Sequence, residues 1–361
     1  MRTALVLLSL MLMQVAGAAA SKTETGRIER AAFRIDFPNP WNHRLIVFFH
    51  GTWDTLGDYQ QDSPLSGFLG ELEAQGYAII QSAYSQPGWA VEQAIDDSER
   101  LRQRFLATHG KPEQTFAIGM SMGGLLTVQA LESRPSAYAG GLSLCGAITP
   151  ADVLLARDFA LRAAFDFYFP NLLGPLVPVP ADFRHSDELS RRIDNALHEN
   201  RNATESMHRL FGVWSEAGFR DLIISTTLDL RELQQRAGGN PFGNANLIYT
   251  GSLDDAALNL GVARYQANPK AAAYLSRWYT PTGKLERPLL AVHTTGDPLV
   301  PASTAFDYAL IARRQGHEGN FVQQFVNAEG HCTIGDTRIV HAFEELVAWT
   351  HGKRPHAGLR E

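Results

Sequence analysis

Short apolar runs alternate with amphipathic segments along most of the chain. Residues 45–49, LIVFF, form a continuous apolar run that ends at His50 and Gly51, as buried strands commonly do where they enter a glycine turn. Similar runs occupy 77–83, 114–118, 140–145, 288–293 and 321–326, and helical patterns separate several of them at 91–108, 122–132, 303–314 and 337–350. The alternation predicts an α/β fold with a mostly parallel sheet and helices on both faces.

Residues 151–285 depart from this alternation. Helical patterns follow one another there, at 151–168, 186–199, 204–217 and 221–236, and Pro-rich or Gly-rich segments join them. Strand-like sequence resumes only at Pro288. We therefore expect a mostly helical lid over 151–285, inserted before a late strand of a core formed by 21–150 and 286–361. A separate C-terminal domain is the weaker interpretation.

The last helical pattern is the clearest one. Ile339, Phe343 and Leu346 fall on one stripe at spacings of three and four residues, which predicts a helix packed against the sheet. After Lys353 no apolar period remains. We expect this C-terminal tail to be frayed.

The first twenty residues have the composition of an export signal. Arg2 precedes a largely apolar run that ends in Ala18-Ala19-Ala20, as in a cleaved secretory signal peptide. The run is shorter than the roughly 20 residues of a bilayer span, and no basic stop-transfer cluster follows it. We therefore expect residues 1–20 to be removed and the protein to be exported, periplasmic or secreted, without a stable membrane anchor.

Charge and motif content narrow the possible partners. The sequence has 38 Asp and Glu residues against 32 Lys and Arg residues, and the basic residues are scattered, which disfavours nucleic acid as a partner. It lacks the H-E-x-x-H, paired C-x-x-C, Walker and EF-hand patterns. We expect neither a metal nor another cofactor. The sequence does not indicate an oligomeric state.

A candidate nucleophile lies in the segment Gly119-Met120-Ser121-Met122-Gly123, which follows an apolar strand pattern and precedes a helical one. This is the strand–turn–helix context of the G-x-S-x-G nucleophile elbow, in which the glycines let strand and helix approach closely and leave the serine hydroxyl exposed. The alternative is a glycine-rich turn without chemistry. The context favours Ser121 as a nucleophile.

Two later loops supply the acid and the base that a serine nucleophile requires. Asp297 follows a predicted strand through a glycine-containing turn, and His331 lies in a Gly-His turn before the final helix. A neutral imidazole at His331 can accept the proton of Ser121 and return it to the leaving group, while Asp297 orients the ring. Asp254 and Asp255 precede the strand and are weaker candidates for the acid.

These residues and their order resemble the α/β-hydrolase superfamily over about 26–150 and 286–350, but not over the lid. The resemblance implies the chain order nucleophile, acid and histidine. It also implies an oxyanion hole of two backbone N–H groups. One would come from Met122, directly after the nucleophile, and the other from the HGTWD loop, at Thr52 in preference to Trp53.

The two cysteines, Cys145 and Cys332, follow a predicted strand and the candidate base. Neighbouring strand ends can bring them together, so an exported chain favours a disulfide over two buried thiols, although spacing alone does not fix the pairing. Feruloyl esterases and tannases are similar in bracing a triad with a disulfide. They carry a cysteine directly before the serine, where this chain has Met120.

The leading functional hypothesis is hydrolysis of a carboxylic ester through an acyl-enzyme. Aromatic and aliphatic residues in the lid at 161–180 predict an apolar pocket wall, and hence neutral aryl or medium-chain esters. The same triad also serves acyltransferases and aminopeptidases, and a non-catalytic binding protein is a further alternative. An aminopeptidase would need acidic groups for the substrate amine. The lid acids Glu199, Glu205, Glu216 and Asp221 look like solvated helix faces.

Overall fold

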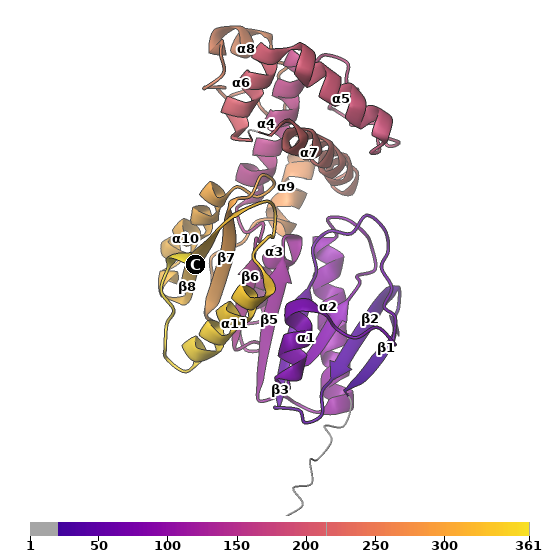
Figure 1. The fold of residues 1–361 in the computed structure, drawn as a ribbon, viewed down its shortest axis with the longest axis vertical. Helices are drawn as coiled ribbons and strands as arrows, with labels where there is room; N and C mark the ends of the chain where they lie inside the picture. The colour runs from indigo at the N-terminus through magenta and orange to yellow at the C-terminus, as the bar shows by residue number, and fades with distance from the viewer. Residues whose placement is uncertain (1–20, 214, 361) are drawn as a thin grey trace, which may run out of the picture.

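The structure, a computed structural model, describes residues 21–213 and 215–360. The predicted signal peptide at 1–20 lies outside the described residues. Within the described part of the chain, nine strands form one sheet in the order β1-β2-β4-β3-β5-β6-β7-β8-β9 (Figure 1). The strands are β1 (Lys22–Ile28), β2 (Ala31–Phe37), β3 (Arg44–Phe49), β4 (Ala78–Ser82), β5 (Gln114–Met120), β6 (Gly140–Leu144), β7 (Leu289–Gly296), β8 (Phe321–Glu329) and β9 (Gly358–Arg360).

The sheet is parallel except at one edge. β1 pairs antiparallel with β2, and β2 pairs antiparallel with β4. The neighbouring strands from β4 to β9 all pair in parallel. Parallel strands end at the same edge of a sheet, so the loops after β3, β5, β6, β7 and β8 come together there.

Helices cover both faces of this sheet, as predicted. Leu72 of α1 and Phe343 of α11 belong to an apolar cluster with Ile46 and Ile118 on one face. A second cluster, on the other face, includes residues of α2, α3 and α10. These helices are α1 (Gly67–Ala74), α2 (Val91–His109), α3 (Met122–Ser133), α10 (Ala305–Arg314) and α11 (Asp336–Thr350), with short 3-10 turns at Ala302–Thr304 and Glu318–Asn320.

The segment between β6 and β7 forms helices throughout most of its length. They are α4 (Ala151–Tyr168), α5 (Asp187–Glu199), α6 (Arg201–Phe211), α7 (Glu216–Arg236), α8 (Asp255–Gly261) and α9 (Pro269–Trp278). We call residues 151–278 the helical region. It lies beyond the end of the sheet (Figure 1), and its buried side chains continue the core formed under α2 and α3.

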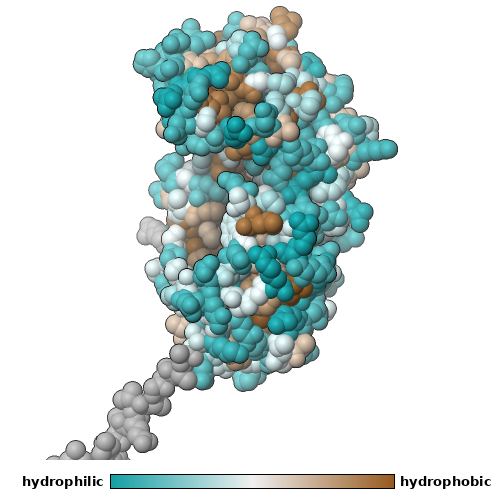
Figure 2. Space-filling view, turned by 90° about the vertical axis from the view of Figure 1, so that its right-hand side faces the viewer, coloured by the Kyte–Doolittle hydropathy of each residue, from teal (hydrophilic) through white to brown (hydrophobic). Residues whose placement is uncertain are grey.

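Most of the surface in Figure 2 is polar, but apolar residues appear within the helical region at the top and in a hollow below it. Among the described residues, no helix combines the length and the apolar character that a bilayer crossing needs.

Two expectations about local structure are wrong. The pattern at 204–217 predicted one helix, but α6 ends at Phe211 because Gly212 takes a left-handed conformation (φ 71°), and Ser215 then caps α7. The C-terminal tail was expected to be frayed, but β9 pairs with β8. Backbone hydrogen bonding to an open sheet edge needs no apolar period, so this pairing left no periodic signal in the sequence.

Candidate active site

Ser121 lies in a tight turn between β5 and α3. Its backbone is in a strained conformation with φ 57° and ψ −120°, and its N–H donates a 3.0 Å hydrogen bond to the carbonyl of Leu144. The flanking glycines are needed because the chain passes too close for a side chain. A Cβ on Gly123 would lie 2.0 Å from the carbonyl oxygen of Phe49, and one on Gly119 would meet the carbonyl of Gly123 at the same distance.

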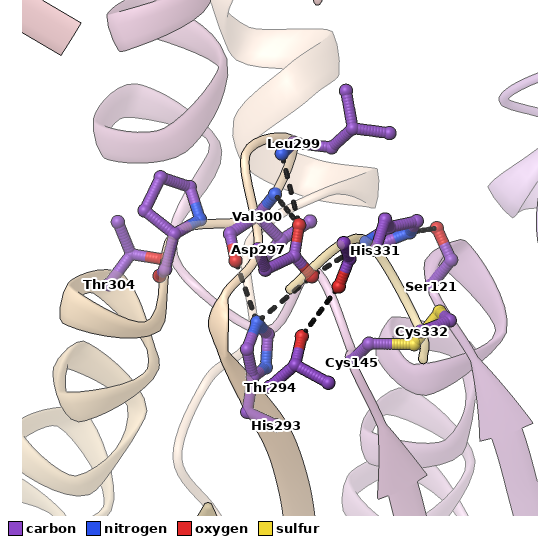
Figure 3. Close-up of polar contacts among 12 residues, drawn as sticks. Ser121, Cys145, His293, Thr294, Asp297, Leu299, Val300, Thr304, His331 and Cys332 are labelled. Carbon is purple, nitrogen blue, oxygen red and sulfur yellow. Dashed lines mark hydrogen bonds and ion pairs between the residues drawn. A yellow bond between two sulfur atoms is a disulfide. The ribbon is translucent and has the colours of Figure 1, made fainter. Parts of the chain in front are cut away.

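A hydrogen-bonded chain links Ser121 to two loops that are distant in sequence (Figure 3). Nε2 of His331 lies 2.9 Å from Oγ of Ser121, and Nδ1 lies 2.7 Å from Oδ2 of Asp297. A neutral imidazole that donates from Nδ1 to the carboxylate leaves Nε2 free to accept from the serine hydroxyl. The structure thus brings together the three residues that the sequence singled out for the triad.

Asp297 is held as an ionised acceptor. Its Oδ1 accepts hydrogen bonds from the backbone N–H groups of Leu299 and Val300, at 3.0 and 2.9 Å. Burial by itself would raise the pKa of this carboxyl, but hydrogen bonds from His293 and His331, together with the backbone of Val300, lower it to about 2. The carboxylate therefore stays charged throughout the neutral range, as an orienting group for histidine must.

The acid loop and the histidine loop are tied to each other. Oγ1 of Thr294, at the end of β7, donates to the carbonyl of Gly330 at 2.8 Å, and the N–H of Gly330 donates to the carbonyl of Gly296 at 3.0 Å. Both contacts involve the residue directly before His331. They fix where the imidazole stands relative to the carboxylate.

A disulfide joins Cys145 to Cys332, so the pairing that the sequence left open is present in the structure, with the two Cα atoms 5.2 Å apart. It connects the end of β6 to the residue after His331. The two sulfur atoms and a ring nitrogen of His331 lie within 4.8 Å of one another, a spacing that would suit a metal ion. Because the sulfurs are bonded to each other, they are not available as thiolate ligands.

Comparisons with known proteins bear on the fold. No protein-family model matches the chain, and no curated protein matches its sequence. Among solved structures, an uncomplexed acylaminoacyl peptidase from Pyrococcus horikoshii matches with a TM-score of 0.50 and 13% identity, over 94% of this chain and 43% of that one. The present chain thus spans less than half of that protein.

Two further structures show the same likeness. An esterase from Pyrococcus furiosus matches with a TM-score of 0.45 and 11% identity, over 96% of this chain and 92% of that one. A puromycin-hydrolyzing peptidase from Mycobacterium tuberculosis matches with a TM-score of 0.48 and 12% identity, over 97% and 43%. The fold is the α/β-hydrolase fold. At these identities the likeness concerns the fold alone, and function has to be argued from the site.

In this α/β-hydrolase fold, both residues that the sequence assigned to the oxyanion hole border the nucleophile. Met122 is the buried first residue of α3, directly after Ser121. Thr52 lines one cavity with Ser121 and His331. The loop that carries Thr52 approaches closely, because a Cβ on Gly51 would lie 3.2 Å from the Cβ of Ser121.

His50 supports this loop and is not part of the hydrogen-bonded chain. Its ring stacks between those of Trp53 and Tyr84, with centroid distances of 3.7 and 4.0 Å. Burial lowers the pKa of His50 to about 4, so the ring is neutral at physiological pH.

A small cavity of about 90 Å³ opens beside Ser121, beneath helices α4 and α7. Leu154, Leu155, Leu222 and Leu299 supply apolar walls, and no residue of the segment 161–180, which the sequence suggested for this wall, lines the cavity. A larger depression of about 660 Å³ adjoins it, and Thr52 and Asp229 line both.

Sequence reasoning missed two acids in this cavity, Asp158 of α4 and Asp229 of α7. A usable signal was present. Leu154, Leu155 and Asp158 follow helical spacing, and so do Leu222 and Asp229, which places each acid on the apolar stripe of its helix.

The acids that the sequence did consider lie elsewhere. Glu205 pairs with Arg209, Glu216 with Arg201, and Asp221 with Arg220, all on exposed helix surfaces, and Glu199 is exposed as well. Asp254 caps α8 by accepting from the N–H of Ala257 at 2.9 Å, and Asp255 accepts from the N–H groups of Gly251 and Ser252. None of these acids lines the cavity beside Ser121.

Proposed function

We propose that this protein is a serine hydrolase that cleaves carboxylic esters through an acyl-enzyme on Ser121. The observation that carries the proposal is the hydrogen-bonded chain from Asp297 through His331 to a half-buried serine at a strained elbow. A serine in a purely structural turn needs neither an imidazole at 2.9 Å nor a buried carboxylate behind it.

In the proposed mechanism each group has one task. Oγ of Ser121 attacks the carbonyl carbon of the ester while Nε2 of His331 takes its proton. The carbonyl oxygen becomes an oxyanion, for which the backbone N–H groups of Met122 and Thr52 are the proposed donors. Collapse of the tetrahedral intermediate breaks the bond to the alcohol oxygen, which leaves with the proton from Nε2.

Deacylation repeats these steps with water as the nucleophile. His331 removes a proton from water, the hydroxide attacks the acyl carbon, and the carboxylic acid is released as Ser121 regains its proton. Asp297 remains ionised and stabilises the imidazolium in both halves of the reaction.

The cavity restricts the acyl group. A volume of about 90 Å³ holds roughly six to nine groups the size of a water molecule, at roughly 10–15 Å³ each. The apolar walls support the neutral aryl or medium-chain acyl groups that the sequence suggested, and the size favours the shorter ones. A second candidate, an aminopeptidase-like activity, draws support from Asp158 and Asp229 in the same cavity.

The decisive test combines turnover with covalent labelling. A panel of p-nitrophenyl esters of graded acyl length and of amino-acid amides is assayed with wild type, Ser121→Ala and the control Ser133→Ala, a change at an exposed serine near the end of α3. We expect ester hydrolysis to fall by roughly 10⁴-fold or more in Ser121→Ala only, and a fluorophosphonate to label Ser121. Ester turnover at the wild-type rate in Ser121→Ala would refute the proposal. Amide turnover above ester turnover would favour the aminopeptidase.

We also propose that the enzyme acts outside the cytoplasm. The disulfide between Cys145 and Cys332 supports this, because such bonds persist mainly in oxidising compartments, and so does the signal-like sequence at 1–20. Mass spectrometry of the protein expressed in a bacterium with a periplasm should find a mature N-terminus near Ser21. Recovery of the intact chain from the cytoplasm would contradict this.

A further inference from the structure

Two carboxyl groups face the cavity that contains the nucleophile. Asp158 comes from α4 and Asp229 from α7, and both line the same small space as Ser121 and His331. The rest of the wall combines aliphatic residues with the hydroxyl groups of Thr52, Ser225 and Thr226 and the indole of Trp89. Burying an ionised carboxyl group without a partner costs free energy. A carboxyl group with a purely structural role is therefore expected to have basic or hydrogen-bonding partners.

Neither carboxyl is fully compensated. Asp158 is only 8% exposed, and its Oδ1 lies 3.2 Å from an Arg157 guanidinium nitrogen, while its Oδ2 forms no hydrogen bond or ion pair with a described residue. Asp229 pairs with no Lys or Arg of the described chain. The buried indole N–H of Trp89 lies close enough to Asp229 to lower the pKa of its carboxyl. It does not meet the geometry of a hydrogen bond to any described residue.

Two half-buried acids of the same region pair with a base. Asp166 pairs with the buried guanidinium of Arg162 within α4. Glu232, one turn beyond Asp229 on α7, pairs with Arg236 and accepts a 2.7 Å hydrogen bond from the backbone N–H of Trp89. Asp158 has one longer contact of this kind, to Arg157, whereas Asp229 pairs with no Lys or Arg of the described residues.

Both carboxyl groups are therefore harder to ionise in the empty cavity than in water. Burial raises the pKa of Asp158 to about 7, although Arg157 opposes the shift. Burial also raises the pKa of Asp229 to about 8, and the neighbouring carboxylates of Asp158 and Glu232 add to the increase. A cation bound between the two groups would remove this penalty, whereas a neutral hydrocarbon would leave it.

We propose that Asp158 and Asp229 bind the protonated amine of the substrate, so that the enzyme acts on esters of small apolar amino acids. The proposal rests on the function proposed above and narrows its substrate class. A leucyl side chain suits the aliphatic part of the wall, formed by Leu154, Leu222 and Leu299. The ammonium would lie beside the acyl carbon that Ser121 attacks.

Binding is tested separately from turnover, in the Ser121→Ala background. Calorimetry at pH 7 compares the ethyl ester of L-leucine, whose amine is largely protonated there, with ethyl 4-methylpentanoate, which has the same skeleton without the amine. We expect the amino ester to bind at least tenfold more tightly. Adding Asp229→Asn or Asp158→Asn should reduce that ratio at least fivefold.

Asp221→Asn is the matched control, because it makes the same change on an exposed face of α7 and should keep the ratio. Equal affinity for the two esters, or a ratio unaltered by both cavity variants, would overturn the inference. Far-ultraviolet circular dichroism and binding of the amine-free ester show whether each variant is folded.

Turnover of the same pair by the enzyme with Ser121 intact separates the two proposals. Selective binding without hydrolysis of either ester would refute the serine hydrolase and leave the amine site standing. Hydrolysis of both esters without preference for the amino ester would refute the amine site and leave the serine hydrolase standing. L-leucinamide carries the same ammonium, so its turnover relative to the leucine ester distinguishes amino-acid esters from peptide-like amides as the source of the amine.

Discussion

Nε2 of His293 lies 3.4 Å from Oδ2 of Asp297, the carboxylate oxygen that also accepts from His331. The same nitrogen donates a 2.6 Å hydrogen bond to the carbonyl of Val300, whose N–H in turn donates to Oδ1 of Asp297. His293 therefore braces the acid loop from beneath, and Figure 3 shows its ring below the carboxylate. It is a positioning residue, since it acts through Asp297.

Replacing His293 should weaken both the fold and the alignment of the acid. In His293→Leu the buried carbonyl of Val300 loses its donor, which should lower the free energy of unfolding by about 1–3 kcal/mol. We expect kcat to fall while KM changes little, because the substrate does not touch this residue. Urea unfolding and steady-state kinetics measure the two effects. His293→Gln, which keeps a donor, should recover part of both, and a variant without change in either would show that the brace is dispensable.

Asp297→Asn should impair turnover far more than substrate binding. The amide can stabilise the wrong tautomer of His331, an effect that costs on the order of 10⁴-fold in kcat in serine proteases. Asp254→Asn is the control, because asparagine also caps helices well and Asp254 serves as the cap of α8. Comparison of kcat for the two variants checks this. A greater loss in Asp254→Asn would move the orienting role into the helical region.

The stability of the protein should reflect the cavity acid Asp229. Its pKa in the folded state is about 8, above the ordinary value, so the folded chain retains a proton that the unfolded chain releases from about pH 4 upward. The contribution of this retained proton to the free energy of unfolding is fully present below about pH 4 and is lost as the pH rises towards 8. Asp229→Asn should therefore be more stable than wild type at pH 9, by at least about 1 kcal/mol, and similar to it at pH 4.

Urea denaturation at the two pH values measures the difference, with Asp221→Asn as the exposed counterpart on the same helix. If the free energy of unfolding depends on pH in the same way for Asp229→Asn and wild type, the pKa of Asp229 is not raised in the folded protein.

The disulfide between Cys145 and Cys332 should stabilise the protein against unfolding. Replacing both cysteines by alanine should lower the free energy of unfolding by roughly 2–5 kcal/mol. A reductant should shift wild type to the stability of the double variant and leave that variant unaffected. Urea unfolding with and without reductant tests this, and alkylation of denatured, unreduced wild type should modify neither cysteine. Full alkylation would disprove the bond.

Local patterns in the sequence were enough to predict the parallel sheet and the three residues of the hydrogen-bonded chain. The apolar run LIVFF became β3, and Ser121, Asp297 and His331 each follow such a run at the edge where parallel strands end. Catalytic residues at strand ends can be predicted because the apolar pattern of the strand and the reactive residue stand next to each other in the sequence.

Features that depend on distant packing were not predicted. β1 was not predicted because it is a polar edge strand, KTETGRI, with no apolar alternation. β2, AAFRIDF, does alternate apolar and charged residues over its second half, so its sequence carried a strand signal. His293 lies within the apolar strand LLAVHTTG, and its role depends on a contact with the loop beyond that strand. Asp158 and Asp229 were missed because charged residues on helices are usually solvated, and only the packing of α4 and α7 over Ser121 gives them a shared cavity.

The bond between Cys145 and Cys332 spans 187 residues and encloses the whole helical region, together with Asp297 and His331. A protease that cuts a loop of the helical region therefore yields two fragments, one with the nucleophile and one with the acid and the base, that stay covalently joined. In an environment rich in proteases, such a nicked molecule would migrate as two species only after reduction. Its two halves could not diffuse apart, so the parts of the triad would remain available to one another.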